Sequence, residues 1–363
     1  MRVALPLLNL VPGSMGGSET YAAELCKELV ASPHVDVRVG LPASARGFAP
    51  PDVSMVAEKV PGGASARDRL VSQLLAEVSP PLRRLVHNAD LVHYPLTVPS
   101  PRPPRNRPFV QTLLDTQHHD LRDNFSRSEL VYRRVRYDAA ARRAAAVITI
   151  SEFCKGRIVH HLGIPAERVH VAYLGVDVDE FAPNLGERDR FVLYPARGWP
   201  HKNHARLIEA MSIVRRTHPD LRLVLTGGSL DPLGDTPPWV DVKGLVSRQE
   251  LLALYQRAAC LAFPSLYEGF GLPPLEAMAS GCPVTAARSG SLPEVCGEAA
   301  VQFDPLDPAD IARGIVEAIA DAATLVERGL GRARQFTWSR CADVHVQVYG
   351  SVLQPGDARS VSH

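Results

Sequence analysis

Short, continuous apolar runs alternate with longer amphipathic stretches along the whole chain. In the first half, the runs predict buried strands and the stretches between them predict helices. The strands expected there are 3–10, 35–39, 91–94, 109–114, 146–150 and 169–173. The helices expected there are 18–30, 66–86 with a break near Pro80 and Pro81, and 126–145. Residues 43–64 are rich in Pro, Gly and Ala and are expected to form a surface loop.

The second half repeats the same alternation. Its expected strands are 191–195, 221–225, 239–243, 260–263 and 283–286, and a final helix is expected over 337–352. Runs that are apolar throughout, rather than at every second residue, are typical of parallel strands covered on both faces. Strands that alternate with helices predict an α/β fold with parallel sheets and helices on both sides.

A chain of 363 residues is too long for one hydrophobic core and predicts two domains. The stretch 174–188 is a candidate linker, because it follows the last strand of the first half and precedes strand 191–195. We expect a first domain over 1–185 and a second over 186–336. A C-terminal helix over 337–353 and a frayed tail over 354–363 follow.

Composition excludes some classes of function. There are 40 basic and 39 acidic residues, so no strong field favours nucleic acid, and the sequence does not indicate membrane association. The first residues predict a strand rather than a signal peptide, and no apolar run is long enough to span a bilayer. None of the six cysteines forms a Cys-x-x-Cys pair. Reduced, buried thiols and a cytoplasmic location are therefore expected.

Residues 263–284, FPSLYEGFGLPPLEAMASGCPV, form the most informative segment. Glu268 and Glu276 are separated by seven residues, with a glycine-rich turn after the first and a helix carrying the second. Pro273 and Pro274 suit a first helical turn, and Gly281 suits the helix end. The pattern predicts a strand, a glycine turn and a helix whose N-terminus faces the carboxyl edge of the sheet. An anionic ligand is favoured at that place.

This segment closely resembles the donor-binding signature of retaining glycosyltransferases of family 4. The resemblance implies the GT-B fold, with two Rossmann-like domains facing a central cleft, and a final helix that crosses back to the first domain. It implies that Glu268 faces the sugar of a nucleotide diphosphate sugar and that Glu276 takes the ribose hydroxyls. It also implies that the amides of Phe270, Gly271 and Leu272 meet the sugar and the diphosphate.

Two basic residues follow strand 191–195. Arg197 and Lys202 lie at the carboxyl end of that strand, where open α/β sheets bind ligands. A guanidinium fork and an ammonium group form a suitable clamp for a diphosphate. The family has an Arg and a Lys five residues apart here that grip the donor, which implies binding and catalytic roles for both residues.

Glycine-containing loops follow three other strands. The loop 13–19 contains Gly16 and Gly17, and the resemblance implies that it reaches the diphosphate or the acceptor; a simple tight turn is the alternative. Gly227 and Leu245 follow strands 221–225 and 239–243, where the family has its nucleotide pocket. Main-chain contacts to the base there would leave little side-chain signature.

The segment 113–120 departs from the family pattern. Many members carry His-Asp directly after this strand, with the histidine near the sugar, but alignment of Asp115 with that aspartate puts Leu114 at the histidine position. His118 or His119 is available further along the loop. We predict that His118 is the catalytic substitute, while a surface or structural role is the alternative for both.

The resemblance implies transfer of a sugar from a nucleotide diphosphate sugar to a hydroxyl acceptor, with retention of configuration. No cofactor and no metal are expected, because Arg197, Lys202 and a helix N-terminus can neutralise the leaving diphosphate. The stretch 291–295 resembles mannosyltransferases, so GDP-mannose is the first expectation and UDP- or dTDP-sugars follow. An epimerase or phosphorylase of the same fold is one alternative. A non-catalytic nucleotide-sugar-binding subunit is another.

Overall fold

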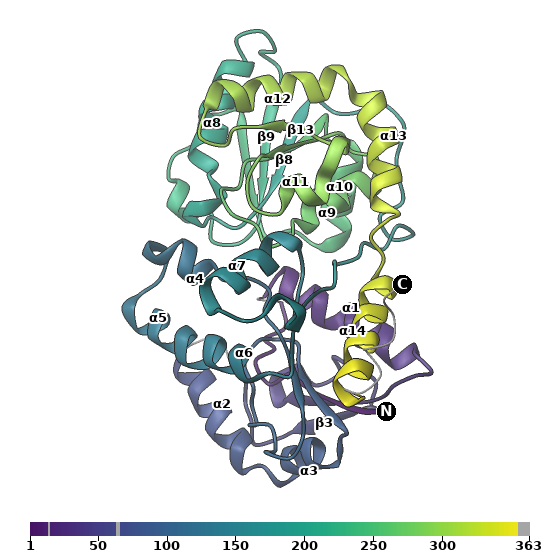
Figure 1. The fold of residues 1–363 in the computed structure, drawn as a ribbon. Coiled ribbons are helices and arrows are strands. Elements are labelled where there is room, and N and C mark those ends of the chain that lie inside the picture. Colours follow the sequence, from purple (N-terminus) through teal and green to yellow (C-terminus); the bar gives the residue numbers. More distant parts are fainter. Residues whose placement is uncertain (14, 63–65, 355–363) are drawn as a thin grey trace. The chain divides into compact units, whose positions relative to one another are not determined.

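The computed structural model describes residues 1–13, 15–62 and 66–354, and it consists of two compact units (Figure 1). Unit 1 comprises Met1–Leu174 together with the segment that begins at Trp338, and unit 2 is Gly175–Thr337. Each unit has a wholly parallel sheet with its own helices. The predicted pair of parallel α/β domains is therefore confirmed. The predicted tail lies outside the described residues from 355 onward.

The sheet of unit 1 has seven strands in the order β3-β2-β1-β4-β5-β6-β7. Their bounds are β1 Arg2–Pro6, β2 Asp36–Pro42, β3 Ser54–Ala57, β4 Leu91–Tyr94, β5 Phe109–Thr112, β6 Ala146–Thr149 and β7 Val169–Val171. The helices are α1 Gly17–Ala31, α2 Ala66–Val78, α3 Pro80–Asn88, α4 Gln117–Asp120, α5 Arg127–Arg133, α6 Ala139–Arg143, α7 Glu152–Leu162 and α14 Trp338–Leu353. Strands β4, β5 and β6 are buried along their whole length, which explains why their runs are mostly apolar.

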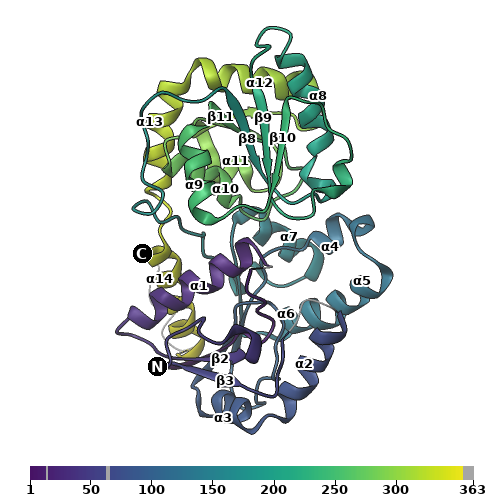
Figure 2. The ribbon, with the colours of Figure 1, turned by 180° about the vertical axis from the view of Figure 1, so that it is seen from behind.

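The sheet of unit 2 has six strands in the order β10-β9-β8-β11-β12-β13. Their bounds are β8 Phe191–Pro195, β9 Arg222–Thr226, β10 Val240–Gly244, β11 Cys260–Phe263, β12 Val284–Ala287 and β13 Val301–Phe303. The helices are α8 His204–Val214, α9 Arg248–Arg257, α10 Leu272–Ala279, α11 Leu292–Cys296, α12 Pro308–Ala320 and α13 Ala322–Ala333. Helices α8 and α12 pack together, and α10 packs on α9 and α13 (Figures 1 and 2).

Both sheets reverse their strand order at one point. In unit 1 the chain builds outward from β1 in one direction and then returns to add β4 on the other side; in unit 2 the same reversal separates β8 from β11. Ligands of open parallel sheets bind outside the carboxyl ends of the strands at this switch point. The loops after β8 and β11 are therefore the ones expected to form a site in unit 2.

Two strands and one helix differ from the sequence prediction. Strand β3 lies within the stretch 43–64 that was expected to be a loop, and β13 was not predicted. Both are short edge strands, of four and three residues, whose pairing partners rather than their own pattern create them. The predicted helix 126–145 is divided into α5, a π-helical segment η3 (Arg134–Asp138) and α6.

The division between the units falls after Leu174, whereas the sequence placed it between residues 185 and 186. The expected linker packs on unit 2. The amide of Val176 donates to the Phe336 carbonyl at 3.1 Å, and the amide of Asn184 donates to the Ser280 carbonyl at 3.3 Å. These contacts are long-range in sequence, so no local pattern reveals them.

The final helix α14 belongs to unit 1 because buried polar groups join it to α1 and to β4 and β5. His345 Nε2 lies 2.8 Å from Tyr21 Oη, which lies 2.8 Å from Thr112 Oγ1. Tyr349 Oη lies 2.7 Å from His93 Nδ1, and His93 Nε2 lies 2.8 Å from the same Thr112 hydroxyl. None of the helices in the described ranges has the length and apolar character needed to cross a bilayer.

Candidate donor-binding site

The loops that follow β8 and β11 meet at the carboxyl edge of the unit 2 sheet. Tyr194, at the end of β8, is fully buried; its hydroxyl donates to the Lys202 carbonyl at 2.6 Å and lies 3.1 Å from Ser265 Oγ. The Leu266 amide donates to the His201 carbonyl at 2.8 Å. Asn203 Nδ2 donates to the Pro264 carbonyl at 3.0 Å. These bonds fix one loop against the other before any ligand arrives.

Lys202 and Glu268 meet across these two loops. Lys202 Nζ lies 2.6 Å from Glu268 Oε1, and the two side chains are only 14% and 13% exposed. A charge-assisted bond of this kind is stronger than a neutral one, and partial burial reduces its screening by solvent. The structure therefore brings together two residues, 66 positions apart in sequence, that were predicted to bind the donor.

Arg197 lies on the same loop as Lys202 and is half-buried. Its guanidinium carbon lies 5.5 Å from the ring centroid of Trp199, at a distance suited to a cation–π contact. Trp199 itself is 47% exposed. The contact orients a planar, permanently charged group at the strand end, as a diphosphate clamp requires.

The turn after Glu268 leads directly into α10. Gly271 precedes the helix with φ +103°, and a Cβ there would lie 2.7 Å from a methyl carbon of Leu292, so only glycine fits. Ser291 holds the turn from the next loop: its hydroxyl donates to the Glu268 and Phe270 carbonyls at 3.0 and 2.8 Å. Phe270, Gly271 and Leu272 are all buried. The helix N-terminus is thus held in one position beside Glu268, with its partial positive charge.

Glu276 lies on α10 and is 9% exposed. Tyr255 Oη, from α9, donates to its Oε2 atom at 2.9 Å. Burial raises the pKa of Glu276 above its ordinary value, and the hydrogen bond from Tyr255 and the charge of Arg248 oppose that rise. The carboxylate is therefore held by one oxygen in a site that favours a further hydrogen-bond donor.

Gly227 and Leu245 follow β9 and β10, at the side of the sheet next to β8. Gly227 has φ +133°, and a Cβ there would lie 2.3 Å from the Ala196 carbonyl oxygen, so a side chain would separate this loop from the Arg197 loop. The Gly227 amide donates to the Gly244 carbonyl at 2.8 Å. Leu245 is 73% exposed. Both predicted residues lie at this strand edge, with the main chain close packed and one apolar side chain exposed.

In unit 1, the predicted residues Gly16 and Gly17 are exposed at the start of α1. The carboxylate of Glu19, in the first turn of that helix, accepts from the Gly13 amide, with both oxygens 2.9 Å away. It also accepts from the Met15 amide at 3.5 Å. Glu19 therefore stabilises the described residues of its own loop, and the contact of Gly16 and Gly17 with the diphosphate or the acceptor stays a prediction.

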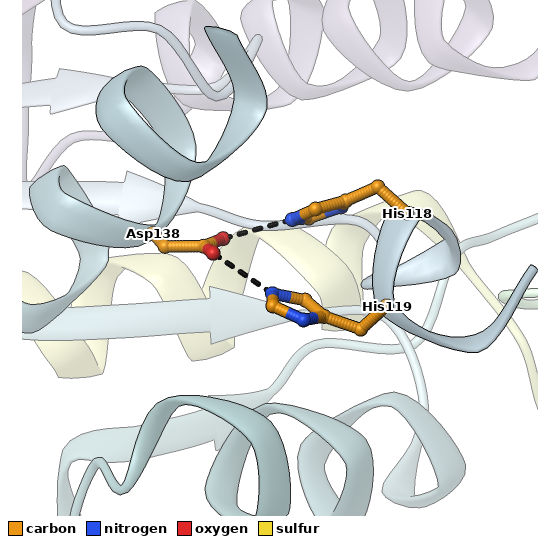
Figure 3. Close-up of side chains that lie close together, drawn as sticks. All are labelled: His118, His119 and Asp138. Atoms are coloured by element: carbon orange, nitrogen blue, oxygen red, sulfur yellow. Dashed lines mark hydrogen bonds and ion pairs between the residues drawn. The ribbon is translucent and has the colours of Figure 1, made fainter. Parts of the chain in front are cut away.

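His118 is completely buried on α4, so its imidazole has no surface with which to contact a substrate in this structure. Its Nε2 atom lies 2.9 Å from Asp138 Oδ1, and His119 Nε2 lies 2.8 Å from Asp138 Oδ2 (Figure 3). Burial acts to raise the pKa of Asp138, but the bonds from both histidines outweigh it and lower that pKa. The predicted catalytic position of His118 does not fit this burial, which the sequence could not reveal. Leu114 is half-buried.

The structure thus assembles Arg197, Lys202, Glu268 and the residues around α10 within unit 2, while His118, Gly16 and Gly17 lie in unit 1. Sequence reasoning missed the residues that hold this assembly: Tyr194, Asn203, Tyr255 and Ser291. Tyr194 and Tyr255 resemble any core aromatic residue in the sequence. The polar Asn203, with φ +63° directly before α8, left a signal that a closer reading of turn residues could find.

Two family models match the chain. The model described as Glycosyltransferase Family 4 matches residues 15–180, and the model described as Glycosyl transferases group 1 matches residues 176–330. The two matches together cover most of both units.

Curated relatives include mannosyltransferases. The chain is 31% identical over 230 residues to the O-antigen chain mannosyltransferase B of Escherichia coli, covering 57% of this chain and 60% of that protein. It is 32% identical over 230 residues to the MMP alpha-(1->4)-mannosyltransferase of Mycolicibacterium hassiacum, covering 59% of this chain and 56% of that protein. The matches thus span less than two thirds of these relatives' own lengths.

Solved structures share the fold over nearly the whole chain. The sucrose-phosphate synthase of Thermosynechococcus elongatus superposes with a TM-score of 0.79 at 21% identity, covering 98% of this chain and 100% of that one. The Anabaena protein Alr3699/HepE, in complex with UDP and glucose, gives 0.72 at 20% identity, covering 97% and 100%. The family models over residues 15–180 and 176–330 identify the chain as a member of glycosyltransferase family 4, and the solved structures show that it has the GT-B fold.

Proposed function

We propose that the protein transfers a sugar from a nucleotide diphosphate sugar to a hydroxyl acceptor, with retention of the anomeric configuration. The observation that carries the proposal is the Lys202–Glu268 pair, held at the carboxyl edge of β8 and β11 by bonds between their loops. Family membership and the mannosyltransferase relatives support the same reading.

The site divides its work among four charged side chains. Arg197 and Lys202 neutralise charge that grows on the diphosphate as the sugar leaves, and the N-terminus of α10 adds its partial positive charge. Glu268, released from Lys202 when the diphosphate takes that partner, accepts bonds from sugar hydroxyls. Glu276 accepts bonds from the ribose hydroxyls, while Tyr255 fixes its other oxygen. The leaving phosphate can accept the acceptor's proton, so no strong enzymic base is required.

We propose GDP-mannose as the donor, with UDP- and dTDP-sugars next. Two relatives that are mannosyltransferases by name support mannose. UDP is the second base to test, since Alr3699/HepE, a structural neighbour at 20% identity, was solved in complex with UDP and glucose.

Two measurements test the proposal in order. Thermal-shift screening against GDP, UDP, dTDP and ADP should reveal one preferred base, since binding to the folded state stabilises it by about 2.7 kcal/mol at one hundred times the dissociation constant. Incubation with the matching sugar nucleotide should then release free nucleoside diphosphate, and the Glu268→Gln variant should release far less. Stabilisation by none of the four nucleotides would contradict the donor site.

A non-catalytic nucleotide-sugar-binding subunit is a second candidate. The complete burial of His118 and the presence of Leu114 favour it, because they leave unit 1 without the histidine that the family pattern has after this strand. A binding subunit would be stabilised by nucleotide but would never release nucleoside diphosphate from the sugar nucleotide, even during long incubation.

A further inference from the structure

Three side chains converge in unit 1. His118 and His119 lie on α4, and Asp138 closes the π-helical segment η3. One ligand atom from each lies within 4.8 Å of the other two. We propose that these three residues form a binding site for a divalent transition-metal ion, with Zn²⁺ as the representative ion. No metal was expected from the sequence, and the local pattern does not reveal this group, since Asp138 lies 20 and 19 residues after the two histidines.

The geometry already directs the coordinating atoms to one place. Both imidazoles present Nε2 to the carboxylate, one to each oxygen, at 2.9 and 2.8 Å (Figure 3). Around a tetrahedral ion with bonds of 2.0–2.1 Å, ligand atoms lie about 3.3 Å apart. Each nitrogen–oxygen pair must therefore separate by about half an ångström to admit an ion, and all three ligand atoms already lie within 4.8 Å of one another.

Charge favours a cation at this position. The Asp138 side chain is 2% exposed, and across residues 1–13, 15–62 and 66–354 no Lys or Arg forms an ion pair with it. A buried carboxylate requires a cation or strong hydrogen bonds. A bound ion supplies the positive charge without requiring either buried imidazole to be protonated.

The donor set selects the class of ion. Two imidazole nitrogens and one carboxylate suit Zn²⁺, Co²⁺ or Fe²⁺, whereas Mg²⁺ and Ca²⁺ prefer oxygen ligands. Coordination moves the proton of each neutral imidazole from Nε2 to Nδ1. His118 Nδ1 has no hydrogen-bond partner in the described part of the chain. The tautomer change puts a proton on this nitrogen, and no hydrogen bond at Nδ1 has to be broken for it. His119, 16% exposed, leaves a route for the ion to enter.

Such an ion would join α4 to η3. Asp138 reaches the histidines from a π-helical turn, a feature found frequently at functional sites. The expected role is to fix the segment after β5, and it does not depend on whether the protein transfers sugar.

Calorimetric titration of Zn²⁺ into the chelator-treated full chain tests the site. One equivalent should bind, and His119→Ala and Asp138→Asn should each weaken that binding at least about 100-fold. His119→Ala is expected to fold, since that side chain is partly exposed. His87→Ala, which removes an exposed histidine from α3, is the matched control and should leave the affinity unchanged.

Co²⁺ gives a second readout, because its visible absorption reports low-coordinate nitrogen and oxygen ligation. The wild type and His87→Ala should show that absorption at one equivalent, and the two ligand variants should not. Absence of stoichiometric binding by the folded wild-type chain would overturn the site. Equal affinity in wild type and His119→Ala would overturn it as well, since the ion would then bind to other histidines.

Discussion

The two units have the same strand order around their switch points but use the loops there differently. In unit 2, Lys202 and Glu268 connect the loops after β8 and β11 through an ion pair, which on the proposed function opens when a diphosphate binds Lys202. In unit 1, Glu19 bonds to the amides of its own loop, and Asp138 takes both histidines of α4. The same topology therefore supports the proposed anion site in unit 2, whereas the polar groups named in unit 1 bond to their own unit and include the proposed metal site.

The buried polar side chains of the two units also differ in what they bond to. Unit 1 contains a buried chain of Tyr21, Thr112, His93, His345 and Tyr349 that joins distant elements. In unit 2, the buried Tyr194 bonds to the loops of the site itself. Polar groups in unit 1 hold the fold together, whereas those in unit 2 position charged side chains for a ligand.

The largest expected effect concerns the charged clamp of unit 2. Arg197→Ala and Lys202→Ala should each lower turnover by roughly 10² to 10³, because each removes charge stabilisation that grows as the diphosphate leaves. Initial rates of nucleoside diphosphate release measure this. Arg222→Ala, at the exposed amino end of β9, is the control and should be near wild type. A near-normal rate in Arg197→Ala would show that this residue does not stabilise the leaving diphosphate, and it would contradict the proposed difference in function between the two units.

The next largest effect is a loss of stability in acid, which should differ between the two units. Burial lowers the pKa of His345 to about 4 and the pKa of His93 well below its ordinary value. The unfolded chain therefore binds more protons than the folded chain between about pH 6.5 and 4, so stability is complete above that range and falls as pH decreases through it. The loss from His345 alone should approach about 3 kcal/mol.

Urea unfolding at several pH values measures how steeply the free energy of unfolding changes with pH. Hydrogen exchange at pH 7 and 5 shows which unit loses stability. In unit 2, burial also lowers the pKa of His204 to about 4, so some acid loss is expected there. Amides of unit 1 should nevertheless lose more protection, because His93 and His345 share one network. In the His345→Gln variant, the free energy of unfolding should change less with pH. An unchanged slope in that variant would show that the network does not control acid stability.

A third prediction separates the two glutamates of the donor site. Glu276→Gln should weaken binding of the free nucleoside diphosphate by about 1.5–3 kcal/mol, because a charged acceptor for the ribose is lost. Glu268→Gln should leave that binding nearly unchanged and mainly reduce turnover of the sugar nucleotide. Calorimetry with the nucleoside diphosphate compares the two variants directly. Equal losses would mean that the glutamates do not divide the work in this way.

The smallest effect tests whether Tyr255 positions Glu276. Tyr255→Phe removes one donor to that carboxylate and should weaken nucleoside diphosphate binding by about 0.5–1.5 kcal/mol. Because this bond opposes the rise in the pKa of Glu276, its loss should raise that pKa further and move the acid limb of binding to higher pH. If Tyr255→Phe weakens nucleoside diphosphate binding but does not change the pH at which binding is lost in acid, the Tyr255 side chain contributes by packing only.

Several elements could be predicted because their signals are local. The bounds of β4, β8 and β11 agree with the sequence prediction, since each is a buried run enclosed by polar or turn residues. Ser151 caps α7, since its side chain accepts from the Cys154 amide at 3.1 Å, as is typical of serine at a helix start. The strand, glycine turn and helix around Glu268 also formed as expected, because Gly271, Pro273 and Pro274 limit the backbone to few conformations.

Other features depended on partners far away in the sequence. The edge strands β3 and β13 form because a neighbour offers hydrogen bonds, and the segment after Leu174 joins unit 2 through contacts with residues about 100 or more positions later. His118 is buried and bonds to Asp138, which lies 20 positions later, and a local pattern does not reveal such a contact.

The sequence by itself therefore determined the alternation of strands and helices, the family and the residue types of the donor site. Tertiary structure alone decided which charges are paired, which carboxylate is fixed by Tyr255 and which histidine is buried. The physical reason is the separation along the chain over which each kind of interaction acts. Backbone preference and apolar periodicity act over a few residues, whereas burial, ion pairing and the pKa of a side chain depend on neighbours that only folding brings together.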